Sequence, residues 1–184
     1  MLRINFRSFF ERSIVIGCLL LFGFGCKQVA KVPVEPEKPL QTYTSSDYAF
    51  ALDYRYPFEV KERDVAIRPQ TYLGLDTSFF ASVRDLVTDT TPMNLAYVYA
   101  YTPARSVDEL IGALEKSGPG IHLEKKETMT IHGIEVTKLL SSTQSGDKKT
   151  HYVFDTNGST IVFSVFLYLE DAFQPILDSL RPSS

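Results

Sequence analysis

Hydrophobic residues are arranged differently in three successive parts of the chain. Ser13–Gly25 is an uncharged and mostly apolar run, whereas residues 27–41 contain no apolar run long enough to pack. From residue 42 onward, alternating and helical patterns follow one another, with turn residues between them. Residues 42–184 are therefore predicted to form a single domain, because that length is sufficient for one well-buried core.

Within this domain, alternating patterns predict an antiparallel sheet. The dipeptide Asn157-Gly158 separates two strand-like segments and predicts a type I′ hairpin, since both residues accept a positive φ. Residues 93–101 and 161–168 are apolar on both faces, which is typical of strands in the middle of a covered sheet. The other predicted strands are Ala49–Tyr54, Phe58–Val60, Ser78–Val83, His122–Ile131, Ile134–Ser141 and Thr150–Asp155, of which His122–Ile131 has one polar face and is expected to be an edge strand or an exposed strand.

Two amphipathic helices complete the domain. Ser106 and Glu109 have the spacing of a capping box, and Gly118-Pro119-Gly120 is expected to end the helix that they begin. A second helix is predicted near the C-terminus, where Pro175 must lie in the first turn or kink the helix. The apolar positions at helical spacing are Val107, Leu110, Ile111 and Leu114 in the first, and Phe173, Ile176, Leu177 and Leu180 in the second. The pattern indicates an α+β domain, a sheet sandwiched between helices and N-terminal segments.

The N-terminus has the organisation of a secretory signal. Three arginines in the first 12 residues precede the apolar run, which as a helix would reach only about 20 Å and is short for a membrane span. Gly23 and Gly25 are small residues placed before Cys26, as signal cleavage requires. A signal whose small-residue site leads directly into a cysteine resembles that of bacterial lipoproteins. This resemblance implies cleavage before Cys26 and acylation of Cys26, with palmitate among the expected acyl chains.

Cys18 is the rival acylation site. It would leave an apolar region too short for a signal, with the run from Leu19 to Gly25 on the mature protein, so Cys26 is preferred. The same N-terminal pattern is also compatible with an uncleaved signal anchor or with a soluble secreted protein. After cleavage Cys26 is the one remaining cysteine, so no disulfide framework is expected. In a host with two membranes, the resemblance implies attachment to the outer membrane, facing the periplasm.

Residues 27–41 are predicted to be a tether. Pro33, Pro36 and Pro39 recur every third residue, which favours an extended polyproline conformation. Loss of residues 1–26 removes three arginines and one glutamate and changes the net charge from −3 to −5, and the domain beyond the tether is more acidic still. The domain is therefore expected to be repelled from anionic headgroups and to stay in solution at the end of its tether, with the acyl chains and not the domain surface binding the membrane, and it is not expected to bind nucleic acid.

The sequence contains no motif of catalytic or metal-binding spacing. His122, His132 and His151 have no second ligand at zinc-site spacing, and no nucleophile elbow or phosphate-binding loop occurs. No catalytic residue, metal site or cofactor is therefore predicted. Tyr97, Tyr99 and Tyr101 form a row on one face of a predicted strand. They could pack in the core beneath a helix or line a cleft for a small ligand.

The order of these features resembles that of the PsbP-like proteins. The resemblance covers most of residues 43–181 and implies an α/β/α sandwich around an antiparallel sheet, often carried by small lipoproteins. Trp, frequent after the opening motif of the family, is absent here, and the family supplies no catalytic or ligand residues that can be matched. The matching segments are Tyr48-Ala49-Phe50, Tyr56-Pro57, Ser106–Leu110, Ile131–Glu135 and Ile176–Leu180.

The sequence thus predicts a membrane-anchored envelope lipoprotein that is not an enzyme. Its domain is expected to bind an unidentified envelope protein or to act as an assembly module. A small-ligand binding module that uses the tyrosine row is the second hypothesis, and a hydrolase is the third.

Overall fold

A computed structural model of the chain describes residues 38–62, 70–72, 75–86, 93–117 and 120–183. The chain divides into two compact units, Met1–Glu37 and Lys38–Ser184, and the described residues all belong to the second. The predicted signal, Cys26 and most of the predicted tether lie outside the described residues. None of the described helices is long and apolar enough to cross a membrane.

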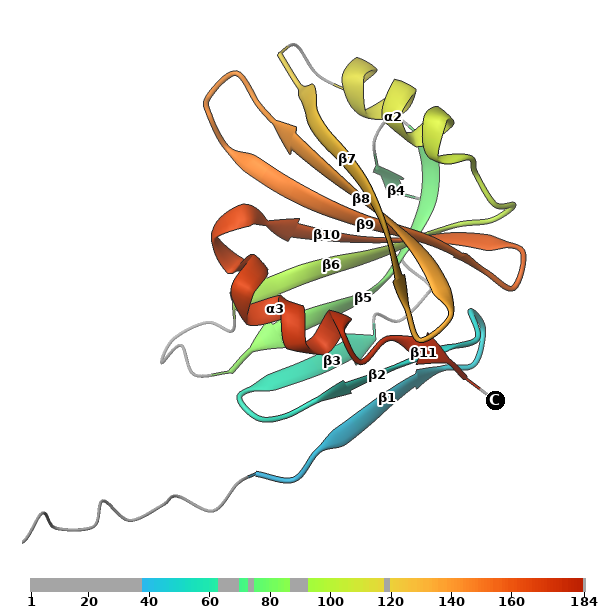
Figure 1. Cartoon of the computed structure of the whole chain (residues 1–184), viewed down its shortest axis with the longest axis vertical. Coiled ribbons are helices and arrows are strands. Elements are labelled where there is room, and N and C mark those ends of the chain that lie inside the picture. Colours follow the sequence, from blue (N-terminus) through green and yellow to red (C-terminus); the bar gives the residue numbers. More distant parts are fainter. Residues whose placement is uncertain (1–37, 63–69, 73–74, 87–92, 118–119, 184) are drawn as a thin grey trace, which may run out of the picture. The chain divides into compact units, whose positions relative to one another are not determined.

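The larger of two antiparallel sheets has the strand order β3-β5-β6-β10-β9-β8-β7, with β4 paired to β5 (Figure 1). The predicted central strands, β6 and β10, are neighbours in its middle, and the predicted edge strand, β7, lies at one edge. The strands are β3 (Phe58–Glu62), β4 (Gln70–Tyr72), β5 (Leu75–Asp85), β6 (Met93–Tyr101), β7 (His122–Ile131), β8 (Ile134–Ser142), β9 (Lys148–Thr156) and β10 (Ser159–Phe166).

The smaller sheet joins the two ends of the domain. It consists of β1 (Gln41–Ser45), β2 (Phe50–Tyr54) and β11 (Arg181–Pro182), with β2 in the centre. The hydrophobic pattern predicts neither outer strand. β1 is mostly polar and begins at the last residue of the predicted tether, and β11 has only two residues, so neither has a hydrophobic period to detect.

The two faces of the larger sheet are covered by different elements. On one face lie α3 (Glu170–Leu177), which follows the 3₁₀ turn η1 (Leu167–Leu169), and the smaller sheet. A chain of edge-to-face aromatic contacts links these layers: Phe50 of β2 contacts Phe154 and Phe163, and Phe163 contacts Phe173 of α3 at 5.8 Å between ring centroids. The opposite face is covered by α2 (Val107–Lys116), which buries Leu110 against Tyr101, Val153 and Val162. The α+β sandwich is thereby confirmed.

Local signals in the sequence account for the best-predicted elements. Ser106 caps α2, and its side chain and that of Glu109 form the reciprocal hydrogen bonds of a capping box. Asn157 and Gly158 both have a positive φ, as the predicted hairpin requires. Gly118 and Pro119, expected to end α2, lie outside the described residues. Pro175 lies in the second turn of α3 and not in the first, because this helix begins at Glu170.

Candidate functional site

The large apolar side chains that are exposed in the described part of the chain gather at one end of the domain. The strand registers place them there. Phe58 pairs with Asp85 and Asp85 with Met93, so the start of β3, the end of β5 and the start of β6 are adjacent. β10 runs antiparallel to β6, which brings η1 to the same end (Figure 1, left side). We call this set the tether-side rim: Leu40, Tyr56, Leu86, Met93, Leu167 and Tyr168.

The chain enters the domain at this rim. Gln41 pairs with Tyr54 at the end of β2, which places the residues just before β1 beside the turn that leads into β3. The Lys38 ammonium lies 3.4 Å from the centroid of the Tyr56 ring, a cation–π contact. Leu40 is itself a rim residue and is 55% exposed. The segment that leads back to the predicted anchor therefore starts from the apolar end of the domain.

The rim contains a mostly apolar cleft of about 450 Å³. Its walls come from the entering segment, the β2–β3 turn and α3, which lie far apart in the sequence. Its apolar lining residues are Leu40, Tyr54, Tyr56, Phe58, Pro175 and Ile176.

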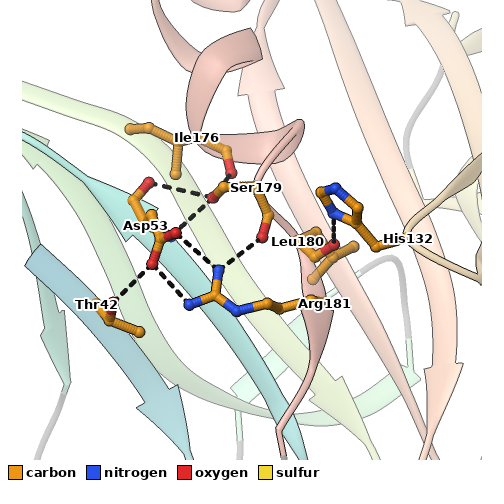
Figure 2. Close-up of polar contacts among 7 residues, drawn as sticks. All are labelled: Thr42, Asp53, His132, Ile176, Ser179, Leu180 and Arg181. Carbon is orange, nitrogen blue, oxygen red and sulfur yellow. Dashed lines mark hydrogen bonds and ion pairs between the residues drawn. The ribbon is translucent and has the colours of Figure 1, made fainter. Parts of the chain in front are cut away.

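A polar clamp closes the smaller sheet beside this cleft (Figure 2). The two terminal nitrogens of Arg181 each donate to one carboxylate oxygen of Asp53 at 2.8 Å, which is a bidentate ion pair. Thr42 donates to the same carboxylate at 2.7 Å, and the Asp53 backbone N–H donates to Ser179 Oγ at 2.7 Å. The hydrogen bond from Arg181 is the main reason that the pKa of Asp53 is lowered. The clamp joins the C-terminus to β1 and β2.

A second polar cluster surrounds Glu170 at the start of α3. Lys138 forms an ion pair with this carboxylate at 2.5 Å, and the hydroxyls of Tyr152 and Thr150 donate to it. Burial works to raise the pKa of Glu170, but the hydrogen bonds from Lys138 and Tyr152 outweigh it and the pKa is lowered. The Glu170 carboxylate thus has polar partners from both neighbouring strands, and these contacts link α3 to β8 and β9.

His151 and Ser141 are the described pair that most resembles a catalytic dyad. His151 Nε2 lies 3.0 Å from Ser141 Oγ, in neighbouring strands β9 and β8. Both side chains are buried, His151 being 2% and Ser141 4% exposed, so a substrate has no direct access to either. Burial, together with the charge of Lys149, lowers the pKa of His151 to about 4. No pattern in the sequence indicates this pair, because only the register of β8 and β9 brings it together.

The remaining residues singled out in the sequence are distributed over the domain. His122 begins β7 and is exposed, and His132, in the β7–β8 turn, has Nδ1 3.0 Å from the Leu180 carbonyl oxygen (Figure 2). The described residues contain no group of three potential metal ligands. Tyr101 is fully buried beneath α2, with Tyr99 half-buried beside it, whereas Tyr97 accepts a hydrogen bond from Asn94 at 3.3 Å. None of these three tyrosines lines the cleft at the rim.

Comparisons with known proteins address the fold. Neither a family model nor a curated protein matches this chain. Among solved structures, it is similar to the solution structure of cyanobacterial PsbP (CyanoP) from Synechocystis sp. PCC 6803, with a TM-score of 0.52 and 12% sequence identity. The chain has a PsbP-like fold. The match covers 82% of this chain and 95% of CyanoP, so the likeness extends over the domain, as the resemblance in the sequence implies.

Proposed function

We propose that this protein is a lipid-anchored, non-enzymatic interaction module of a bacterial envelope. Cys26 carries the acyl chains, the segment between Cys26 and the described domain forms the tether, and the PsbP-like domain holds an envelope protein at the membrane surface. In a host with two membranes, the anchor lies in the outer membrane and the domain faces the periplasm. Several acyl chains hold a protein stably at a bilayer, whereas a single chain gives only reversible binding.

The observation that carries the proposal is the contrast between polar and apolar groups in the described domain. Its partly buried charged clusters are used in internal contacts, as in the pairs Arg181–Asp53 and Lys138–Glu170. No buried side-chain nitrogen or oxygen among the described residues lacks a hydrogen-bond partner. The large exposed apolar side chains, by contrast, lie together at one end, which is typical of a contact surface.

Metabolic labelling with an alkyne fatty acid tests the anchor. The wild-type chain and the Cys18→Ala variant are expected to take up the label, and Cys26→Ala is expected to lose it. Labelling lost only in Cys18→Ala would move the anchor to that cysteine.

Crosslinking in intact cells followed by mass spectrometry tests the interaction, and we expect a reproducible envelope-protein adduct. A specific turnover that is lost from cells without the protein and restored by the purified chain would overturn the non-enzymatic assignment.

The cleft at the rim supports a second candidate function, the binding of a small apolar ligand. Its volume of about 450 Å³ lies in the range of known ligand sites, and its lining is mostly apolar. Thermal-shift screening of apolar compounds checks this candidate. A ligand that stabilises the wild type and Tyr97→Ala but not Tyr56→Ala would place it in the cleft. A ligand that stabilises Tyr56→Ala but not Tyr97→Ala would favour the tyrosine row. If no compound stabilises the wild type, both proposed ligand sites are wrong.

A further inference from the structure

We infer that the tether-side rim rests on the lipid bilayer to which the chain is anchored, so that the domain has a fixed orientation on the membrane. This inference builds on the proposed function, since it names the surface that the anchored domain turns toward the lipid. The inference adds a second, weaker contact with the bilayer, made by the described domain itself, to the covalent anchor at Cys26. The rim is also the contact surface cited for the proposed function; the inference assigns this surface to lipid, and a protein partner then binds another face of the domain.

The rim concentrates exposed apolar groups. Single exposed apolar side chains are ordinary on protein surfaces, but a group of them at one end indicates a contact. Tyr168 is 74% exposed and follows Leu167, which is 38% exposed, on the η1 turn. Leu169 and Phe173 are the residues of this segment that are buried in the core, whereas the exposed Tyr168 ring stacks on the half-buried Phe166 at 5.6 Å between ring centroids.

The entering chain places the rim near the anchor. Leu40 belongs both to the segment that leads toward Cys26 and to the rim, and Lys38 contacts the rim residue Tyr56. Lys38 is 12 positions beyond Cys26, which is about 37 Å for a fully extended polyproline chain. An acylated Cys26 therefore keeps the rim within a few nanometres of the bilayer and raises its effective concentration there.

The chemistry of the rim suits a membrane interface. Tyrosine is favoured there because its ring is apolar and its hydroxyl remains hydrated, and lysine stems extend along apolar surfaces toward headgroups. Two lysines lie beside the rim with their ammonium groups over aromatic rings: Lys38 over Tyr56, and Lys149, whose ammonium lies 4.7 Å from the centroid of the Phe166 ring. Asp85 and Asp171 lie at the same end, so the contact is expected to be apolar in origin and insensitive to salt.

The absence of tryptophan from the chain provides a direct test. A single tryptophan is introduced at the rim as Tyr168→Trp or, as the matched control, as Ser46→Trp. Ser46 is exposed in the β1–β2 turn at the opposite end of the domain. Each acylated full-length variant is purified from membranes and reconstituted into phosphatidylcholine vesicles with or without brominated acyl chains, after flotation has established that it is vesicle-bound.

We expect the emission of Tyr168→Trp to shift to the blue and to be quenched by the brominated lipid, at low and high salt alike. Ser46→Trp should show neither effect. Adding Leu167→Asp to Tyr168→Trp should abolish the quenching without releasing the protein from the vesicles. A vesicle-bound protein in which neither tryptophan is quenched, or both are quenched equally, would overturn the inference and leave the anchor intact. A protein that does not float with the vesicles would contradict both the lipid anchor and the inference.

A photocrosslinking residue at position 168 in intact cells distinguishes lipid from protein at the rim. Recovery of lipid adducts is the result expected. A protein adduct at position 168 would overturn the bilayer contact, and it would support the proposed interaction module with the rim as its protein-binding surface.

Discussion

The two ends of the domain differ in the apolar side chains that they expose beside their chain reversals, although both ends have turns with a positive-φ glycine, Gly158 at one end and Gly146 in the β8–β9 turn at the other. At the end opposite the rim, the β9–β10 turn uses Asn157 and Gly158, and the β7–β8 turn uses His132 and Gly133, all with positive φ. These polar turns also contact neighbouring segments, since Asn157 Nδ2 donates to the Asp47 carbonyl oxygen at 3.0 Å. At the tether-side rim, the chain reverses beside exposed leucine, methionine and tyrosine side chains.

This difference shows which exposed residues the fold itself explains. Turn geometry requires residues that accept positive φ, and Asn157 and Gly158 meet that requirement. No comparable backbone requirement selects an exposed Tyr168 or Leu167, whose segment is helical. The rim residues are therefore better explained by a contact that the domain makes with something else. If so, substitutions at the rim and in the core should have different consequences for stability.

The greatest loss of stability is expected from a core residue close to the rim. Phe173 of α3 is fully buried and contacts Phe163 and Tyr152, so Phe173→Ala should lower the free energy of unfolding by about 3–5 kcal/mol. The matched rim variant Tyr168→Ala should change it by about 1 kcal/mol or less, because the exposed Tyr168 loses little more than its stacking on Phe166. Urea denaturation of the two variants measures both values. A large loss in Tyr168→Ala would give the rim a structural role and weaken the case for a contact surface.

Mild acid is expected to lower the stability of the domain somewhat less than Phe173→Ala does. The pKa of His151 is about 4 in the folded chain and about 6.5 when unfolded, so between these pH values the unfolded chain binds a proton that the folded chain does not. The free energy of unfolding should therefore fall by up to about 3 kcal/mol as the pH falls from 6.5 to 4. Asp53 and Glu170, whose pKa values are lowered, add to this loss as the pH falls toward and below the ordinary values of their carboxyls, 3.8 and 4.5.

Urea denaturation at a series of pH values, together with NMR titration of the three histidines, checks this prediction. The His151 ring signal should remain that of a neutral imidazole down to about pH 4. A His151 ring that titrates near pH 6.5 in the folded protein would contradict it.

Of the features tested, the partly exposed polar clamp should contribute least to the free energy of unfolding. Arg181→Ala should lower the free energy of unfolding by about 1–2 kcal/mol, because it removes a bidentate pair that water partly screens. Arg181→Lys should lose less, since a lysine retains the charge but not the fork of donors. Urea denaturation curves of both variants give the two free energies of unfolding. An equal loss of stability in both would contradict this prediction, because the charge that lysine keeps would then contribute nothing.

Much of the fold can be predicted because its signals are local. The capping box of Ser106 and Glu109, the Asn157-Gly158 turn and the apolar faces of β6 and β10 each lie within a few consecutive residues. β11 cannot be predicted in this way, because it depends on a tertiary contact between Arg181 and Asp53, which are 128 positions apart. Of the two alternatives predicted for Pro175, a position in the first turn or a kink, the first is wrong, because α3 begins at Glu170 after a 3₁₀ turn and has no side-chain cap to mark its start.

The candidate site is harder to predict than the fold. Alternation correctly places Tyr97, Tyr99 and Tyr101 on one strand, but it cannot distinguish a buried position from an exposed one. The rim combines residues from five separate segments, and only the strand registers bring these together. One signal is present: the apolar run of β10 continues through Leu167 and Tyr168, beyond the end of the strand.

The mass of the mature protein, purified from membranes, decides whether the domain is anchored through Cys26. We expect a polypeptide that begins at Cys26 and carries additional mass equal to a diacylglycerol, together with any further N-terminal acyl chain. An unmodified chain that begins at another residue, or one that still carries residues 1–25, would contradict the anchor on which the orientation of the rim depends.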